Sequence, residues 1–288
     1  MLAEIILAAG CFWSVQATFD SIPGIEETQV GYIGGDVKNP TYEQVCTDKT
    51  GHAEAVRIIY NTDIISTEEI LDIFFQTHDA TTLNQQGADI GTQYRSVIFY
   101  TTLEQKKIAE EKIKEYTPFF HYPIVTEVVK ASEFFPAEEY HQKYFEKQGK
   151  KTNCQIKEIK NFDKEAYYRH KMGKERYAIM REKGTEQPYT GKYVVFDENG
   201  TYRCGACGAL LFSSNDKFAS SSGWPSFDKA LPNAVKIQKD FSHFMIRNEV
   251  ICARCGSHLG HVFNDGPTKT KKRFCINSIA LDFEKDDL

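Results

Sequence analysis

The chain has 288 residues, a length that favours two domains of ordinary size. Hydrophobic residues make up 41% of it and charged residues 26%, which supports buried cores and excludes long-range disorder. The formal net charge of -5 argues against a general nucleic-acid binder, and no apolar run approaches the ~18 residues of a membrane span. We therefore expect neither nucleic acid nor membrane among the partners.

The first half of the chain alternates predicted strands and helices, which indicates an α/β or α+β domain, a two-layer sandwich around a mixed sheet. The apolar residues at the beginning of the sequence are predicted to form a buried strand, because the apolar segment is short and lacks the basic region of a signal peptide. Capping boxes at Ser66–Glu69 and Thr102–Gln105 predict two helix starts. Strands are expected at 5–8, 55–60, 96–100 and 124–129, and helices from 12, from 66, from 102 to about 116, and over 136–148.

The pattern changes after about residue 155. Residues 164–183 are expected to be helical, and the sequence from Tyr193 is β-rich. Asn199-Gly200 between apolar segments at 193–196 and 201–203 predicts a β-hairpin. Further strands are expected at 234–238, 243–247, 249–252, 261–264 and 274–283. We place an N-terminal domain over 1–154, a linker over 155–163, and a mainly β domain that contains zinc over 164–288.

Two CxxC pairs in the second half indicate a metal site. They are formed by Cys204 with Cys207 and by Cys252 with Cys255, and 44 residues separate the pairs. Two thiolates from each of two tight turns complete a tetrahedral Cys₄ zinc site, which leaves no open position and is therefore structural. A redox-active CxxC and free buried cysteines are the alternatives, whereas the long gap argues against a compact zinc finger.

Cys11 is a candidate nucleophile in the first half, because it lies where a strand ends and a helix begins. A helix N-terminus favours thiolate, although a buried and inert cysteine fits the same position. Glu54 lies among small and apolar neighbours, so it could stay protonated and act as an acid; an ordinary paired surface carboxylate is the alternative. Tyr42 and Tyr94 lie in turn-like segments, where their phenols could donate hydrogen bonds to a polar ligand.

Cys275 is the candidate nucleophile of the second half. Strand alternation would put it on one face with Arg273 and Asn277, and the basic residues from 269 to 273 would lower the pKa of its thiol. A solvated basic loop explains those charges equally well. His258 and His261 offer two imidazoles close behind a CxxC pair, although four cysteines already suffice for a metal.

These segments resemble two enzyme families in one chain. The first half resembles peptide methionine sulfoxide reductase A over about 4–154, through Gly-Cys-Phe-Trp at 10–13, Gly-His-Ala-Glu-Ala-Val at 51–56 and Gly-Thr-Gln-Tyr-Arg-Ser at 91–96. The second half resembles reductase B over about 164–284, through the CxxC pairs, Ser-Gly-Trp-Pro-Ser-Phe at 222–227, His-Leu-Gly-His-Val-Phe at 258–263 and Arg-Phe-Cys-Ile-Asn-Ser at 273–278. The whole chain looks like a bifunctional reductase AB.

The resemblance implies that the first half reduces the S epimer of methionine sulfoxide and the second half the R epimer. Cys11 and Cys275 would be the nucleophiles, and Glu54 would protonate the sulfoxide oxygen. In the first half Phe12 and Trp13 would hold the ε-methyl group of the substrate, and Tyr42 and Tyr94 would assist the acid. Asp89 would support the site, and Cys154 would be the resolving cysteine. In the second half His261, with His258 and Asn277, would assist proton transfer, and Trp224 would face the methyl.

The sequence departs from the reductase B pattern at Ser222, where many relatives keep a resolving cysteine. Direct attack by thioredoxin, by glutathione or by a thiol of the first half could regenerate Cys275, and we expect thioredoxin. Cys46 is expected to be a structural or spare thiol. No organic cofactor is expected, and the cysteine usage suits the reducing cytoplasm.

Two other readings of the sequence remain open. One is a zinc-ribbon binding module fused to an α/β domain, for instance a redox-sensing regulator. The other is a disulfide oxidoreductase that uses a CxxC pair catalytically.

Overall fold

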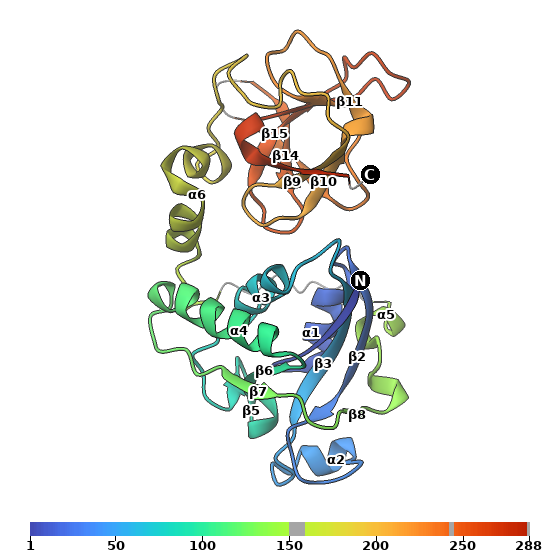
Figure 1. The fold of residues 1–288 in the computed structure, drawn as a ribbon, viewed down its shortest axis with the longest axis vertical. Coiled ribbons are helices and arrows are strands. Elements are labelled where there is room, and N and C mark those ends of the chain that lie inside the picture. The colour runs from blue at the N-terminus through green and yellow to red at the C-terminus, as the bar shows by residue number, and fades with distance from the viewer. Residues whose placement is uncertain (150–158, 242–244, 287–288) are drawn as a thin grey trace. The chain divides into compact units, whose positions relative to one another are not determined.

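The computed structural model describes residues 1–149, 159–241 and 245–286, and Cys154 lies outside these residues. The chain divides into two compact units, Met1–Lys164 and Glu165–Leu288 (Figure 1). No described helix combines the length and the apolar character needed to cross a membrane.

Unit 1 is built on a six-stranded sheet in the order β7-β6-β1-β3-β2-β8. Only β6 and β7 pair in parallel, so the sheet is mixed, and the expected α/β fold with a mixed sheet is confirmed. Its strands are β1 (Leu2–Ala9), β2 (Ile25–Ile33), β3 (Ala53–Asn61), β6 (Ser96–Tyr100), β7 (Glu127–Lys130) and β8 (Phe135–Pro136), with a small hairpin of β4 (Gln85–Gln86) and β5 (Asp89–Ile90). Its helices are α1 (Phe12–Asp20), α2 (Tyr42–Val45), α3 (Thr67–Phe75), α4 (Leu103–Tyr116) and α5 (Tyr144–Lys147).

Local side-chain bonds explain where the longer helices begin. Ser66 Oγ accepts the amide of Glu69 at 3.2 Å, and Glu69 Oε2 accepts the amide of Ser66 at 3.1 Å, which completes the predicted capping box of α3. The second predicted box is only half formed. Thr102 caps α4, but the side chain of Gln105 accepts the amide of Thr101 instead.

The predicted helix over 136–148 is wrong. This segment contains the end of β8, a 3₁₀ turn (Glu139–His141) and the short α5. Lys143 interrupts it with φ of 52°, and its ammonium group binds Thr28 Oγ1 at 2.8 Å as well as Asp20. These tertiary bonds outweigh the helical spacing of the apolar residues and wrap the segment around α1.

The central strands of the sheet are buried on both faces. Ala53 and Ala55 of β3 lie in a cluster of small and apolar side chains on one face, where Phe134 covers them. Side chains alternate along a strand, so Glu54 points to the opposite face. There it lies beside Tyr32, its register partner on β2. The alternation thus places one buried carboxyl among aromatic side chains.

Unit 2 contains two antiparallel sheets, of order β10-β9-β17 and β11-β12-β16-β15-β14-β13, which confirms the mainly β architecture. Phe212 of the small sheet stacks on Phe227 of the large one at 4.4 Å, and Tyr202 packs on the same ring at 5.0 Å. Before the sheets comes α6 (Lys164–Met180), which Gly173 interrupts. The strands are β9 (Gly200–Cys204), β10 (Leu210–Ser213), β11 (Lys217–Phe218), β12 (Ser226–Phe227), β13 (Val235–Asp240), β14 (Arg247–Cys252), β15 (His258–Phe263), β16 (Arg273–Ile276) and β17 (Leu281–Lys285).

The hairpin predicted around Asn199-Gly200 is wrong. Residues 193–196 form no strand, because Tyr193 and Phe196 turn their rings onto one another at 5.2 Å and the amide of Tyr193 donates to Ser278 Oγ. The partners of β9 are β10 and the late strand β17. Gly200 is needed for that pairing, because a Cβ there would lie 2.2 Å from the carbonyl oxygen of Glu284.

Part of the predicted linker packs on unit 1. Phe162 stacks on Tyr116 at 5.7 Å and lies 4.9 Å from the ring of Phe120, and its side chain is buried. The amide of Asp163 donates to the carbonyl of Phe119. These contacts fasten residues 159–163 to the end of α4 rather than leaving them as a free connection.

Candidate functional sites

Cys11 lies at the junction predicted for it, between β1 and the first turn of α1, and is half-buried. The expectation that the helix N-terminus makes it a thiolate is wrong for the free protein. Burial, and then the charge of Glu54, raise the pKa of Cys11 to about 11, which outweighs the amides of Trp13 and Ser14. The thiol is therefore protonated near neutral pH until another change lowers its pKa.

Among the charged groups that raise the pKa of Cys11, Glu54 has the largest effect, and it is 2% exposed. Burial raises its pKa to about 7, helped by the charge of Asp89 and opposed by the amide of Phe12, which donates to Oε2 at 3.1 Å. The alternative of an ordinary surface carboxylate is thus excluded by burial. A carboxyl group with a pKa near neutrality can deliver a proton at physiological pH.

Tyr94 ends a 3₁₀ turn (Thr92–Tyr94) and Tyr42 begins α2, and the charge of Glu54 acts on both phenols. Burial, followed by the charges of Glu54 and Asp89, raises the pKa of Tyr94 to about 12. Burial and a bond to Cys46 likewise raise the pKa of Tyr42. Both phenols therefore keep their protons and can donate hydrogen bonds, as the sequence suggested.

A group of aromatic rings follows Cys11, and we call it the wall: Phe12, Trp13, Tyr32, His141 and Tyr144. Trp13 stacks on Tyr144 at 3.9 Å with an interplanar angle of 9°, and its Nε1 donates to His141 Nδ1 at 3.0 Å. Phe12 lies 5.2 Å from the ring of His141 and 5.9 Å from that of Tyr32. An indole N–H can only donate, so His141 must keep Nδ1 unprotonated. Burial supports this state because it lowers the pKa of His141.

Sequence reasoning missed the groups that hold this wall. Glu138 accepts Tyr32 Oη and the amide of Tyr42, both at 2.9 Å, and so joins β2 to α2. The sequence also gave no role to His141 and Tyr144, which lie in the segment 136–148 that helical spacing predicts to be one helix. The irregular backbone of that segment lets Glu138 bond to Tyr32 and Tyr42 and lets His141 and Tyr144 contact Trp13, and helical spacing gave no sign of these contacts.

Cys275 lies on β16 between two strands, opposite Ser226 of β12 and His261 of β15. Burial raises the pKa of its thiol, opposed by a hydrogen bond to Ser222 Oγ at 3.7 Å and by the charge of Arg273. The predicted lowering acts through Arg273, whose charge and side-chain hydrogen bond lower the pKa of the thiol, but burial outweighs it and the net shift is upward. Asp265 pairs with Arg273 at 2.7 Å.

A bulge in β15 brings the two histidines to the face of this cysteine. His261 pairs with Glu249 of β14, but the register shifts so that His258 pairs with Ile251. Since Glu249 and Ile251 share a face, His258 and His261 share it too, with ring centroids 5.4 Å apart. Regular alternation would have put the two imidazoles on opposite faces.

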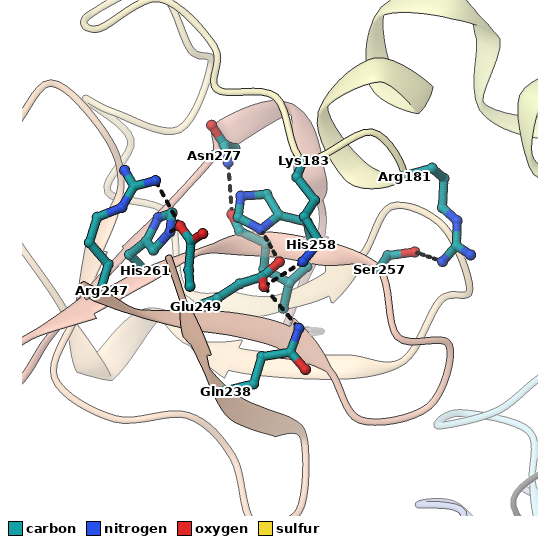
Figure 2. Close-up of polar contacts among 11 residues, drawn as sticks. Arg181, Lys183, Gln238, Arg247, Glu249, Ser257, His258, His261 and Asn277 are labelled. Carbon is teal, nitrogen blue, oxygen red and sulfur yellow. Dashed lines mark hydrogen bonds and ion pairs between the residues drawn. The ribbon is translucent and has the colours of Figure 1, made fainter. Parts of the chain in front are cut away.

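Each imidazole is held by a carboxylate that sequence reasoning missed (Figure 2). Glu249 accepts from His258 Nδ1 at 2.8 Å and also binds Lys183 at 2.9 Å and Gln238 at 2.8 Å. Asp240 binds His261 Nε2 at 2.9 Å and Arg247 at 2.7 Å. These carboxylates fix the orientation of both rings. Nε2 of His258 is buried and has no hydrogen-bond partner among the described residues.

Asn277 and Trp224 meet at the chain segment before β9. The side chain of Asn277 donates to the carbonyl of Leu259 at 3.0 Å and accepts the amide of Glu186 at 3.0 Å. Trp224 Nε1 donates to the carbonyl of Glu186 at 3.2 Å. Both polar ends of Asn277 therefore bind main chain, so it positions β15 and the Glu186 segment.

Four cysteine side chains converge at the ends of two hairpins. Their sulfurs lie within 4.8 Å of one another. Cys204 Sγ lies 3.8 Å from Cys255 Sγ, and Cys207 Sγ lies 3.7 Å from Cys252 Sγ. Tetrahedral zinc with Zn–S bonds of about 2.3 Å separates its sulfurs by roughly 3.8 Å, so the residues fit the ion. The four-cysteine cluster is consistent with zinc binding, as the spacing predicted.

The two CxxC turns have the same backbone bonds. Gly208 donates to the carbonyl of Cys204 at 2.8 Å, and Gly256 donates to that of Cys252 at 2.9 Å. Both glycines have positive φ, 73° and 74°, which favours glycine at these positions. The turns end β9 and β14, so the cluster joins the small sheet of unit 2 to the large one.

Comparisons with known proteins match both halves of the chain. The family model of peptide methionine sulfoxide reductase matches residues 3–175, and that of the SelR domain matches residues 172–285. Peptide methionine sulfoxide reductase MsrA/MsrB of Vibrio cholerae is 36% identical over 97% of this chain and 84% of its own length. Reduced Mxr1 from Saccharomyces cerevisiae matches with TM-score 0.51 and 34% identity, over 54% of this chain and 90% of that chain. Methionine sulfoxide reductase A of Corynebacterium diphtheriae matches with TM-score 0.49 and 32% identity, over 51% of this chain and 76% of that chain.

An α/β unit with a half-buried cysteine beside a carboxyl group whose pKa is near neutrality, followed by a β unit with a second cysteine and a Cys₄ cluster, defines a two-domain thiol oxidoreductase. The chain belongs to the family of bifunctional peptide methionine sulfoxide reductases MsrA/MsrB. It is an enzyme that reduces methionine sulfoxide.

Proposed function

We propose that the two cysteines divide the work by chirality, with Cys11 reducing the S epimer and Cys275 the R epimer. The observation that carries this proposal is that each unit buries one cysteine beside its own proton-handling groups, Glu54 in one and His261 in the other. Each epimer of methionine sulfoxide is served by a separate reductase. Two differently built sites in one chain meet that requirement.

In unit 1 the reaction begins with proton donation. The sulfoxide sulfur becomes electrophilic when Glu54 protonates the oxygen, with Tyr42 and Tyr94 donating hydrogen bonds to it. The sulfur–oxygen bond of the sulfoxide breaks as the sulfur–oxygen bond of the sulfenic acid forms. The proton from Glu54 stays on the transferred oxygen, and the thiol proton of Cys11 returns to Glu54, so that the step balances. Methionine leaves and Cys11 carries a sulfenic acid. Phe12 and Trp13 form the apolar wall against the methyl, and Asp89 helps to keep Glu54 protonated through its charge.

Glu54→Gln is expected to lower kcat/KM for the S epimer by about 10²- to 10⁴-fold, because a positioned acid is lost.

The same substitution should also stabilise unit 1. The folded pKa of about 7 exceeds the ordinary value of 4.5, so wild-type stability falls as pH rises between these values. By pH 8 the neutral amide should raise the free energy of unfolding by roughly 3 kcal/mol. Urea unfolding at pH 5 and pH 8, followed by Trp13 fluorescence in a Trp224→Phe background, measures it. An equal free energy change at both pH values would contradict the assignment of Glu54.

In unit 2 the acid–base work falls to the histidines. His261 lies opposite Cys275 and is held by Asp240, while His258 is held by Glu249 and Asn277 keeps β15 in place. The imidazoles carry the proton that the sulfoxide oxygen takes up, and Trp224 contacts the methyl group.

Regeneration differs between the units. Cys154 attacks the sulfenic acid of Cys11, which releases water and forms a disulfide that thioredoxin reduces. Unit 2 has Ser222 where a second thiol would stand, at 3.7 Å from Cys275 Sγ. Thioredoxin therefore reduces this sulfenic acid directly: its first thiol displaces water to form a mixed disulfide, and its second thiol releases Cys275. Mass spectrometry after one turnover without thioredoxin should find no internal disulfide at Cys275.

The Cys₄ cluster holds one structural zinc ion. Four protein thiolates leave no open position, so the ion stabilises unit 2 and takes no part in the reaction. No organic cofactor is needed, because the electrons come from thiols. Dependence on thioredoxin suits the cytoplasm, where thiols are kept reduced.

The test supplies the purified chain with each separated epimer of a peptide methionine sulfoxide, thioredoxin, thioredoxin reductase and NADPH. We expect both epimers to be consumed, with one methionine formed per NADPH. Consumption of only one epimer would show that one of the two cysteine sites is not a reductase site.

A further inference from the structure

Three serine hydroxyls form a connected group next to Cys275. Ser222 Oγ lies 2.7 Å from Ser220 Oγ and 3.4 Å from Ser226 Oγ, and Ser226 Oγ lies 3.1 Å from Ser220 Oγ. The carbonyl of Trp224 lies 3.3 Å from both Ser222 Oγ and Ser226 Oγ. Ser226 is 1% exposed and sits opposite Cys275 in the strand register, so the group is built into the sheet.

The hydrogen bonds of this group can be arranged in two ways. When Cys275 is a thiol, it donates to Ser222, Ser222 donates to the Trp224 carbonyl, and Ser226 donates to Ser220. When Cys275 is a thiolate it needs a donor, and Ser222 is the hydroxyl within reach. Ser222 can turn toward the sulfur because Ser226 reaches the same carbonyl and replaces it there. Neither arrangement leaves the Trp224 carbonyl without a donor.

We propose that Ser222 is a positioning residue that switches from acceptor to donor when Cys275 loses its proton, with Ser226 as the reserve donor that makes the switch possible. This inference deepens the proposed role of Cys275 and rests on it. A cysteine in place of Ser222 would resolve the sulfenic acid, whereas a hydroxyl group cannot. The hydroxyl instead stabilises the attacking thiolate, which a buried thiol with a raised pKa requires.

Few charged groups compete with this hydroxyl. Arg273 acts on the sulfur from the same strand through its charge and through a side-chain hydrogen bond, and Asp265 pairs with Arg273 at 2.7 Å. His261 faces Cys275 from β15 and is bound to Asp240. The strand on the other side, β12, presents Ser226, which carries no charge. Two described side chains thus bond to the sulfur: the charged Arg273, which can only donate, and the neutral hydroxyl of Ser222, which can change from acceptor to donor when Cys275 loses its proton.

The experiment measures the pKa of Cys275 without relying on catalysis. The full-length, zinc-loaded protein is alkylated with iodoacetamide from pH 5 to pH 11, and mass spectrometry of the peptide that contains Cys275 gives the rate. Ser222→Ala should raise the midpoint by on the order of one pH unit, because a hydrogen bond to a charged group is lost. Ser226→Ala should raise it by less. Ser222→Thr, which keeps the hydroxyl, and Ser221→Ala, at an exposed neighbour, should leave it unchanged.

An unshifted midpoint in both Ser222→Ala and Ser226→Ala would overturn the inference. A shift of equal size in Ser221→Ala would overturn it as well, because a general loosening of the segment would then explain the effect. Failure of the proposed function would look different: Cys275→Ser would still reduce the R epimer. In catalysis, the same shift should lower kcat/KM of Ser222→Ala for the R epimer by about 10-fold at pH 7 while S-epimer turnover stays constant.

Discussion

Cys11→Ser is expected to lose S-epimer reduction by about 10⁴-fold or more and to keep R-epimer reduction, while Cys275→Ser should do the reverse. A hydroxyl group is a far weaker nucleophile than a thiolate and forms no sulfenic acid, so the serine variant cannot complete the reaction. The losses should be separate because each unit has its own core and its own proton-handling groups. Separated epimers, assayed by chromatography with thioredoxin as reductant, measure both activities in each variant.

Cys46→Ser is the matched control for these variants. Its thiol is exposed at the end of α2, away from either nucleophile position, and the serine hydroxyl can still accept the hydrogen bond that Tyr42 makes to it. The control should retain both activities to within about 2-fold, since surface substitutions usually change little. If Cys11→Ser or Cys275→Ser lost both activities, the two units would have to share electrons or a site, and the division by chirality would be wrong.

Loss of the zinc ion should unfold unit 2 and spare unit 1. Cys204→Ser removes one of the four sulfurs that join the small sheet to the large sheet. Apparent binding free energies at structural zinc sites are about 10 kcal/mol or more, comparable with the whole stability of a domain. We therefore expect R-epimer reduction to disappear while S-epimer reduction continues. Zinc released to a colorimetric chelator, circular dichroism and limited proteolysis should follow the loss together.

The same experiment separates the reductase from a disulfide oxidoreductase with a catalytic CxxC pair. For the latter, activity would survive chelation of the metal and would still vanish in Cys204→Ser. For the structural site, strong chelation and Cys204→Ser should give the same loss of R-epimer reduction. A folded, zinc-free unit 2 with full activity would exclude the structural role.

Local signals in the sequence were sufficient for much of the fold. Strand β6 occupies the predicted 96–100, and α3 begins at its predicted capping box, because these features depend on neighbouring residues. The CxxC pairs likewise predicted a four-sulfur cluster, since each turn closes within five residues. The hairpin at Asn199-Gly200 failed because the partners of β9 both follow it in sequence: β10 is close by, but β17 lies about 80 residues further along the chain, beyond the reach of any local pattern.

The chemistry of the sites was harder to predict than their positions. Motifs suggested Cys11 and Cys275 as the nucleophiles, but they did not give the direction of the pKa shifts, because burial outweighs the nearby donors and cations. Glu138 and Asp240 were missed because each acts on a residue far away in sequence. The bulge that brings His258 beside His261 also has no sequence pattern that distinguishes it from regular alternation.

The pairing of β9 with β17 determines the order in which the two units can fold during synthesis. The described strands of unit 1 have all been translated by residue 136, whereas the small sheet of unit 2 lacks one of its three strands until residues 281–285 have left the ribosome. Cys204 and Cys207 must also wait for Cys252 and Cys255 before four thiolates can surround an ion. Unit 1 can therefore fold while translation continues, and unit 2 closes only afterwards. During that interval Cys204 and Cys207 lack the two cysteines that complete the cluster, so unit 2 gains its four-sulfur cross-link last.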